Sequence, residues 1–228
     1  MKVQQKSTEG TSSSKLQITE DTRLRGSWLL LARVVWFILV ALALLVFIFS
    51  LPVYIAQLYS VCNGIACGTG QLTPQFVETL RIHGFTIGAY VTINVVLAFV
   101  QAFVWYAVGG VLFWRKSNDW MALLVALMML LLGTGVVLNT VAGSFSLWQF
   151  PSRLIDFLAY LLLILVILLF PNGRFVPRWS WLLMIVFIPV EWLYNFFPNS
   201  LLNNTNWNDL IWIAIVISIF ATQLYRYR

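Results

Sequence analysis

The feature that most constrains this chain is a series of long apolar blocks. The first, from Trp28 to Leu51, would measure roughly 36 Å as an α-helix, which exceeds a bilayer hydrocarbon core of about 30 Å. It is also longer than the apolar region of about 7–15 residues in a secretory signal peptide. Because lipid offers no hydrogen-bond partners to the backbone, such blocks must be helical. The sequence therefore predicts an all-α membrane protein.

Six such blocks follow one another, over residues 28–51, 85–113, 120–142, 151–170, 179–197 and 209–225. Tryptophan and tyrosine gather at their ends, as amphipathic rings do at the headgroup layer of a bilayer. We therefore expect a bundle of about six transmembrane helices over residues 27–228. Residues 1–26 are polar and low in complexity, which predicts a disordered basic tail.

Three prolines give expectations about where helices begin, bend and end. The first block runs on into Pro52, and we expect a loop from Val53 to His83 with a short helical stretch around Gln75–Arg81. Pro151 is expected at the first helical position of the fourth block, where its missing N–H costs nothing. Pro189 lies inside the fifth block and is expected to kink it.

Basic residues are distributed unevenly between the segments that connect the blocks. If six spans alternate across the bilayer, one side receives Lys2, Lys6, Lys15, Arg23, Arg25, Arg115, Lys116, Arg174, Arg178, Arg226 and Arg228. The other side receives Arg81 and Arg153, while Arg33 lies inside the first span and is expected to reach back toward the tail. Because segments rich in Lys and Arg remain in the cytoplasm, we expect both termini there.

The two cysteines, Cys62 and Cys67, lie in the first sizeable loop, which this orientation places outside the cytoplasm. A disulfide can persist there, and we favour a small loop closed by this pair. Two free thiols are the alternative interpretation. Two cysteines alone are too few for a zinc site, so we expect no metal.

Composition excludes several classes of function. Apolar residues make up 61% of the chain and charged residues 10%, against roughly 25% charged residues in soluble domains. The net charge of +6 does not indicate nucleic-acid binding, because the basic residues form no single patch. The sequence has no metal-binding His/Glu helix, nucleophile elbow or phosphate-binding glycine loop. We therefore expect no enzyme, no catalytic residue and no cofactor, with the lipid bilayer as the main partner.

Polar side chains inside the apolar blocks are candidate functional groups, because burying them in lipid is costly. They are Asn94, Gln101, Asn139, Asp156 and Glu191. Asp156 follows Arg153 by three residues, so an interfacial ion pair is the simpler interpretation. Glu191 is either a proton or cation site or a carboxylate near the surface. Asparagine and glutamine in such helices more often bond to neighbouring helices than to a substrate.

The connection between the fourth and fifth blocks forms a compact motif, made of Pro171, Asn172, Gly173, Arg174, Phe175, Pro177, Arg178 and Trp179. Its Pro-Asn-Gly sequence predicts a tight turn. Arginines there can meet anionic headgroups, and the aromatic rings suit the interface. From the residues alone, this is an ordinary basic turn on the cytoplasmic side.

The sequence nevertheless resembles the N-terminal membrane region of bacterial sensor histidine kinases of the Chloroflexi-like type. The likeness rests on "LFPNGRFVPRW", often with Asp at the position of Asn172, on the cysteine-containing first loop, on "LTP" before the second span and on the ending "TQLYRYR". It covers most of residues 28–228, and its motifs are mainly structural.

This resemblance implies a sensory or anchoring input module in a bacterial inner membrane, serving a dimeric cytoplasmic kinase or a response regulator. Members of the family continue past the position of Arg228 into further spans and then phosphoacceptor and ATP-binding domains. This sequence stops there, so we expect no kinase activity from it. Two alternatives stay open: a small transporter in which Asp156 or Glu191 lines a polar cavity, and a structural anchor that recruits partners.

Overall fold

A computed structural model of the chain describes residues 26–63, 67, 70–141, 146–170, 173–197 and 205–227. Its helices are α1 (Ser27–Tyr59), α2 (Pro74–Ile82), α3 (Ile87–Lys116), α4 (Trp120–Val141), α5 (Ser146–Leu169), the 3-10 turn η1 (Arg178–Ser180), α6 (Trp181–Phe196) and α7 (Thr205–Tyr227). Over the described ranges, the β-structure is limited to isolated bridge positions, among them the pair Val61 and Leu72. The predicted all-helical class is confirmed. The expected tail falls outside the described residues, apart from Gly26.

Four helical segments in the described part of the chain are long and apolar enough to cross a membrane: Ser27–Tyr59, Ile87–Lys116, Trp148–Leu169 and Arg178–Phe196. The stretches Trp120–Gly135 of α4 and Leu210–Tyr225 of α7 are apolar but shorter. The outer surface is apolar as well, since Phe103 and Trp114 of α3 are 73% and 88% exposed. The membrane character is therefore shown, with two fewer such helices than the six apolar blocks of the sequence.

Helix α1 continues through Pro52 to Tyr59, so the loop expected from Val53 begins seven residues later, at Ser60. The added turns are held by packing, because Tyr54 and Leu58 are buried against Val91 of α3. Apolar burial there offsets the backbone hydrogen bond that proline removes. The short helix expected around Gln75–Arg81 is present as α2.

Helix α5 begins at Ser146, which places Pro151 inside the helix and overturns the expectation that it stands at the first helical position. The Trp148 ring stacks on Phe49 of α1 with centroids 4.8 Å apart, and this contact supports the extra N-terminal turn. Pro189 likewise lies within α6. Helix α7 begins at Thr205, earlier than the apolar block that starts at 209.

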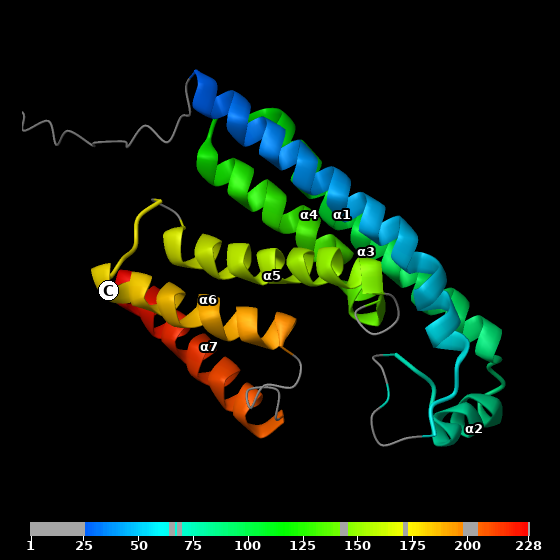
Figure 1. Cartoon of the computed structure of the whole chain (residues 1–228). Coiled ribbons are helices and arrows are strands. Elements are labelled where there is room, and N and C mark those ends of the chain that lie inside the picture. The colour runs from blue at the N-terminus through cyan, green and yellow to red at the C-terminus, as the bar shows by residue number, and fades with distance from the viewer. Residues whose placement is uncertain are drawn as a thin grey trace, which may run out of the picture.

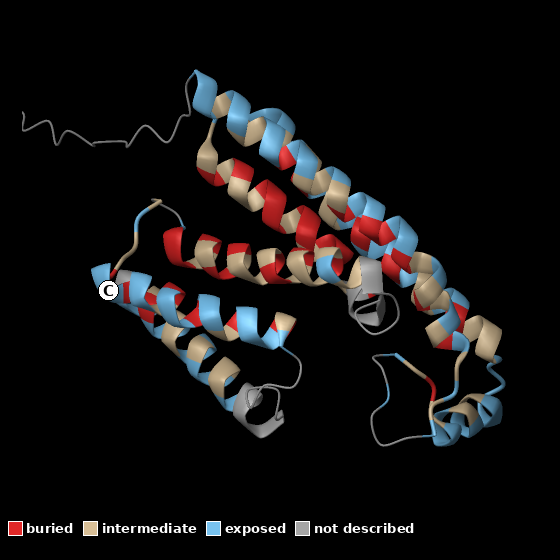
Figure 2. Cartoon of the chain, viewed as in Figure 1, coloured by how far each residue is buried: buried red, intermediate tan, exposed pale blue. Residues whose placement is uncertain are grey.

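Helix α4 lies at the centre of the molecule and contacts α1, α3 and α5, while α6 and α7 pack on the far side of α5 (Figure 1). Buried residues concentrate on α4 and α5, and α1 and α7 expose much of their surface (Figure 2). Helices α3 and α4 approach closely at glycines. A Cβ at Gly109 would lie 2.9 Å from the Ala126 carbonyl oxygen, and one at Gly133 would lie 2.9 Å from Trp105 Cβ.

The connections gather at two ends of the bundle. At one end, Arg33 of α1 donates from Nη2 to Ser117 Oγ (2.6 Å) and Asn118 Oδ1 (2.9 Å) in the α3–α4 turn. Gly173 of the α5–α6 connection lies against Trp120 of α4 at this end. The cysteine loop and α2 lie at the other end (Figure 1).

Candidate functional site

A buried carboxylate on α6 is the most unusual polar group in the described part of the bundle. Glu191 is 2% exposed, although it lies in a helix that is apolar enough to cross a membrane. Its Oε1 accepts a hydrogen bond of 2.9 Å from Asn195 Nδ2, which also donates to the Glu191 backbone oxygen at 3.0 Å. The asparagine, one helical turn later, therefore satisfies part of the hydrogen-bonding capacity of this carboxyl group.

A second carboxylate lies in the neighbouring helix, within electrostatic range of Glu191. Asp156 of α5 and Glu191 are close enough to interact electrostatically, and both act on the hydroxyl of Tyr160. The Tyr160 ring meets Trp212 of α7 with centroids 5.7 Å apart. Asp156, Tyr160, Glu191 and Asn195 therefore form one group, called here the acidic cluster, which lies between α5 and α6 and reaches α7.

The ion pair expected between Arg153 and Asp156 is not formed, since no salt bridge joins them in the described part of the chain. The Asp156 carboxyl group is half-buried and lies within electrostatic range of Glu191. Two carboxylates in a site of low polarity repel each other when both are charged. The two groups therefore concentrate negative charge between two helices that are otherwise apolar.

Asn94 and Gln101, two of the other polar candidates, are not brought to this cluster. Asn94 of α3 is half-buried and donates from Nδ2 to the backbone oxygen of Tyr90 in its own helix, at 2.8 Å. Gln101 of α3 is exposed on the outer surface. Asn139 belongs to α4, but its side chain lies outside the described residues. The lone His83 contacts the Thr79 backbone oxygen through Nδ1 at 2.8 Å.

The cysteine loop contains the favoured disulfide, between Cys62 and Cys67, with Cα atoms 5.8 Å apart. The loop is also tied to the bundle, because the Tyr90 hydroxyl of α3 donates to the Gly70 backbone oxygen at 3.0 Å. A bridge between Val61 and Leu72 closes the base of the loop. The result is a small closed lobe at one end of the bundle.

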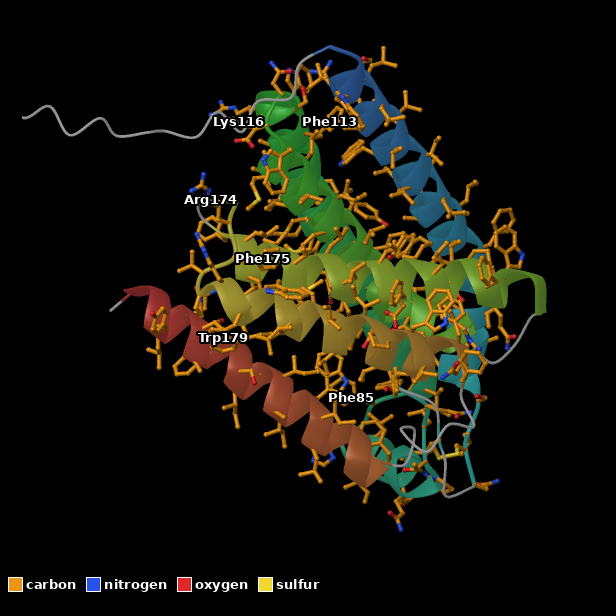
Figure 3. All side chains as sticks on the ribbon, turned by 60° about the vertical axis from the view of Figure 1, so that its left-hand side comes forward. Phe85, Phe113, Lys116, Arg174, Phe175 and Trp179 are labelled. Atoms are coloured by element: carbon orange, nitrogen blue, oxygen red, sulfur yellow. A yellow bond between two sulfur atoms is a disulfide. The ribbon has the colours of Figure 1, made fainter. Side chains whose placement is uncertain are left out.

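The motif between α5 and α6 is described from Gly173 onward, and Pro171 and Asn172 lie outside the described residues. Gly173 has φ of +68°, which suits glycine, and its N–H donates to the Leu169 oxygen to end α5. Phe175 packs toward the α5–α6 core, whereas Arg174, Arg178 and Trp179 are exposed (Figure 3). Pro177 is buried, in the part of the motif that leads into η1.

Two polar contacts were missed by reasoning from the sequence. Asn195 follows Glu191 by four residues, and this helical spacing could have indicated the pair. The contact of Arg33 with Ser117 and Asn118 joins residues more than eighty positions apart, and no local pattern signals it.

The fold and these sites define a class: an all-helical membrane protein with a disulfide-closed loop at one end and an acidic cluster between two helices, in which Glu191 and Asn195 are buried. No family model, no curated protein and no solved structure matches the chain. Function must therefore be argued from the residues themselves.

Proposed function

We propose that the chain is a sensory or anchoring membrane domain, comparable to the input region of a two-component sensor histidine kinase, with α7 as its output helix. The observation that carries this proposal is the attachment of α7. It packs on α5 and α6 through one face, while Ile213, Val216 and Phe220 on the opposite face are 55%, 58% and 64% exposed. A helix held on one side can shift without unpacking the central bundle.

Polar contacts connect α7 to the rest of the proposed sensor. Gln223 donates from Nε2 to the Ile167 backbone oxygen of α5 at 2.6 Å, beside the buried Thr222. Nearer the N-terminus of α7, the Trp212 ring contacts Tyr160 of the acidic cluster. A stimulus that changes the packing of α5 against α6 would therefore move α7 at two points, provided that it binds two states with different affinity.

The proposed topology has six crossings of a bacterial inner membrane, with both termini in the cytoplasm. It is supported by the contact of Arg33 with the α3–α4 turn and by that of Gly173 with Trp120, which gather basic connections at one end. Reporter fusions at Asn118 and at Gly70 test it. Cytoplasmic signals at Asn118 and external signals at Gly70 are expected, and the reverse pattern would reject this topology.

The signalling role is tested with a chimera in which a histidine-kinase core is fused after Arg228. Autophosphorylation is then compared between the wild type, Gln223→Leu and the matched control Gln101→Leu. Gln223→Leu should change the kinase rate, because it removes the polar contact between α7 and α5. Gln101 is exposed on α3, so its replacement should leave the rate unchanged.

Each outcome of the chimera experiment is informative. A kinase rate that depends on Gln223 but not on Gln101 supports a sensory role. Equal rates in all three chimeras would contradict a sensory role and leave a membrane anchor as the function. An anchor is expected to bind a cytoplasmic partner through the Arg174 turn.

A small transporter is the second candidate, and the acidic cluster favours it. Asp156 and Glu191 lie in neighbouring helices within electrostatic range of each other, and carboxylates at such a depth could exchange a proton or cation with a path between the helices. Flux in proteoliposomes that is lost in Glu191→Gln, but retained in Glu78→Gln on α2, would support transport. Unchanged flux in Glu191→Gln would exclude this carboxylate from the path.

A further inference from the structure

An apolar groove runs between the first halves of α1 and α4, at the basic end of the bundle. It has a volume of about 310 Å³, within the roughly 300–1,000 Å³ of small-molecule sites. Trp28, Val35 and Trp36 form one wall, and Trp120 and Leu127 form the other. We call it the α1–α4 groove. Its lining is almost entirely apolar, which suits a hydrocarbon chain.

The groove lies next to a positive charge that the described residues do not neutralise. Arg33 follows Ala32, a lining residue, and its guanidinium bonds to the neutral groups of Ser117 and Asn118. Its Nε, and Nε1 of Trp36, are buried without a hydrogen-bond partner. The nearby Asp119 carboxylate accepts from the Met121 N–H at 3.0 Å and caps α4.

Further positive charge surrounds the same end. Arg115 and Lys116 are exposed immediately before Ser117, and Figure 3 shows Lys116 and Arg174 at the same end of the bundle. Trp120 joins the two features, because it lines the groove and lies against Gly173, the neighbour of Arg174. An apolar groove beside a cluster of cations fits a ligand with a hydrocarbon tail and an anionic head.

We propose that an anionic glycerophospholipid binds at this end of the protein, with one acyl chain in the α1–α4 groove and its phosphate beside Arg33. The phosphate accepts hydrogen bonds from the guanidinium donors and balances its charge. Tryptophans at the groove contact the region where acyl chain and headgroup meet. This site goes beyond the proposed function, since it concerns neither α7 nor the acidic cluster.

The test is native mass spectrometry of the full chain, titrated in detergent with phosphatidylglycerol or phosphatidylcholine of the same acyl chains. The wild type should bind one phosphatidylglycerol at least tenfold more tightly than phosphatidylcholine. Arg33→Gln should weaken phosphatidylglycerol binding about fivefold, which corresponds to about 1 kcal/mol. Arg33→Lys should retain most of the preference, because it keeps the charge.

The groove is tested separately by filling it. Val35 lines the groove and is 45% exposed, so Val35→Trp adds bulk without disturbing a buried side chain. Its matched control is Val100→Trp on α3, where the side chain is 53% exposed and does not line the groove. Val35→Trp should weaken binding at least fivefold, and Val100→Trp should not. Arg81→Gln, on α2 at the other end, controls for charge alone.

The outcomes separate the alternatives. Equal affinity for the two lipids, or binding that survives both Arg33→Gln and Val35→Trp, would overturn the proposal. Competition by glycerol phosphate as strong as that by the whole lipid would show an anion site without an acyl chain, and would overturn it as well. Loss in Arg33→Gln and Val35→Trp, with wild-type affinity in both controls, would support it.

Discussion

The two halves of the bundle are held together by different means. Helices α1, α3 and α4 meet through small and apolar residues such as Ala43, Ala102 and Gly109. Helices α5, α6 and α7 meet through large aromatic rings such as Phe157, Trp192 and Trp212, and Gln223 of α7 adds a hydrogen bond to the Ile167 backbone oxygen of α5. Helices α3 and α4 therefore approach backbone to backbone at Gly109, whereas α5, α6 and α7 meet through large side chains.

This difference indicates which half can move. In lipid there is no hydrophobic force between helices, so close van der Waals contact at small residues is what fixes α3 against α4. Such contact favours one geometry, because a shift of a fraction of an ångström loses much of the van der Waals attraction between the helices. Large side chains can instead rotate to other staggered rotamers, and the hydrogen bond of Gln223 can be exchanged for another. We therefore expect conformational change in the α5–α7 half on a rigid α1–α3–α4 half.

The largest expected effect comes from filling the α3–α4 contact. Gly109→Val places a Cβ 2.9 Å from both the Ala126 backbone oxygen and Leu130 Cγ. The Ala126 oxygen belongs to the helix backbone, so it cannot relieve the clash by a change of rotamer. We expect a loss of about 3 kcal/mol in the free energy of unfolding, measured by titration with SDS in mixed micelles. The matched control is Gly110→Val, where nothing lies within 4 Å of the added Cβ. Equal losses in the two variants would mean that close approach does not hold this half.

The second prediction concerns the acidic cluster. Asn195→Leu removes the donor to Glu191 and leaves a buried carboxyl group without that bond, so we expect a loss of about 1–3 kcal/mol in the same titration. Asn94→Leu is the matched control, because Asn94 bonds to its own helix backbone and not to a carboxylate. If Asn94→Leu lowers the free energy of unfolding as much as Asn195→Leu does, the bond between Asn195 and Glu191 stabilises the protein no more than an ordinary bond to the helix backbone.

The sequence predicted those parts of the structure that local patterns determine. Apolar blocks identified α1 and the helices from α3 to α7, and the Cys62–Cys67 disulfide was predicted correctly, since both follow from neighbouring residues. Helix ends near Pro52 and Pro151 were wrong, because packing of Leu58 and Trp148 outweighs the local effect of proline. For the candidate site, Asp156 and Glu191 were named separately. Their meeting depends on how α5 crosses α6, which no single segment encodes.

The smallest expected effect tests the attachment of α7. Gln223→Leu removes the hydrogen bond to the Ile167 oxygen, and such bonds between membrane helices contribute about 0.6 kcal/mol on average. We expect a loss of that size in the free energy of unfolding, with no loss for Gln101→Leu on the outer surface of α3. Because this loss is small, the rate of cysteine cross-linking between α5 and α7 is a more sensitive measurement. We expect this rate to change in Gln223→Leu relative to the wild type. An unchanged cross-linking rate would mean that apolar packing alone holds α7, and the contrast between a rigid and a movable half would then lose its main support.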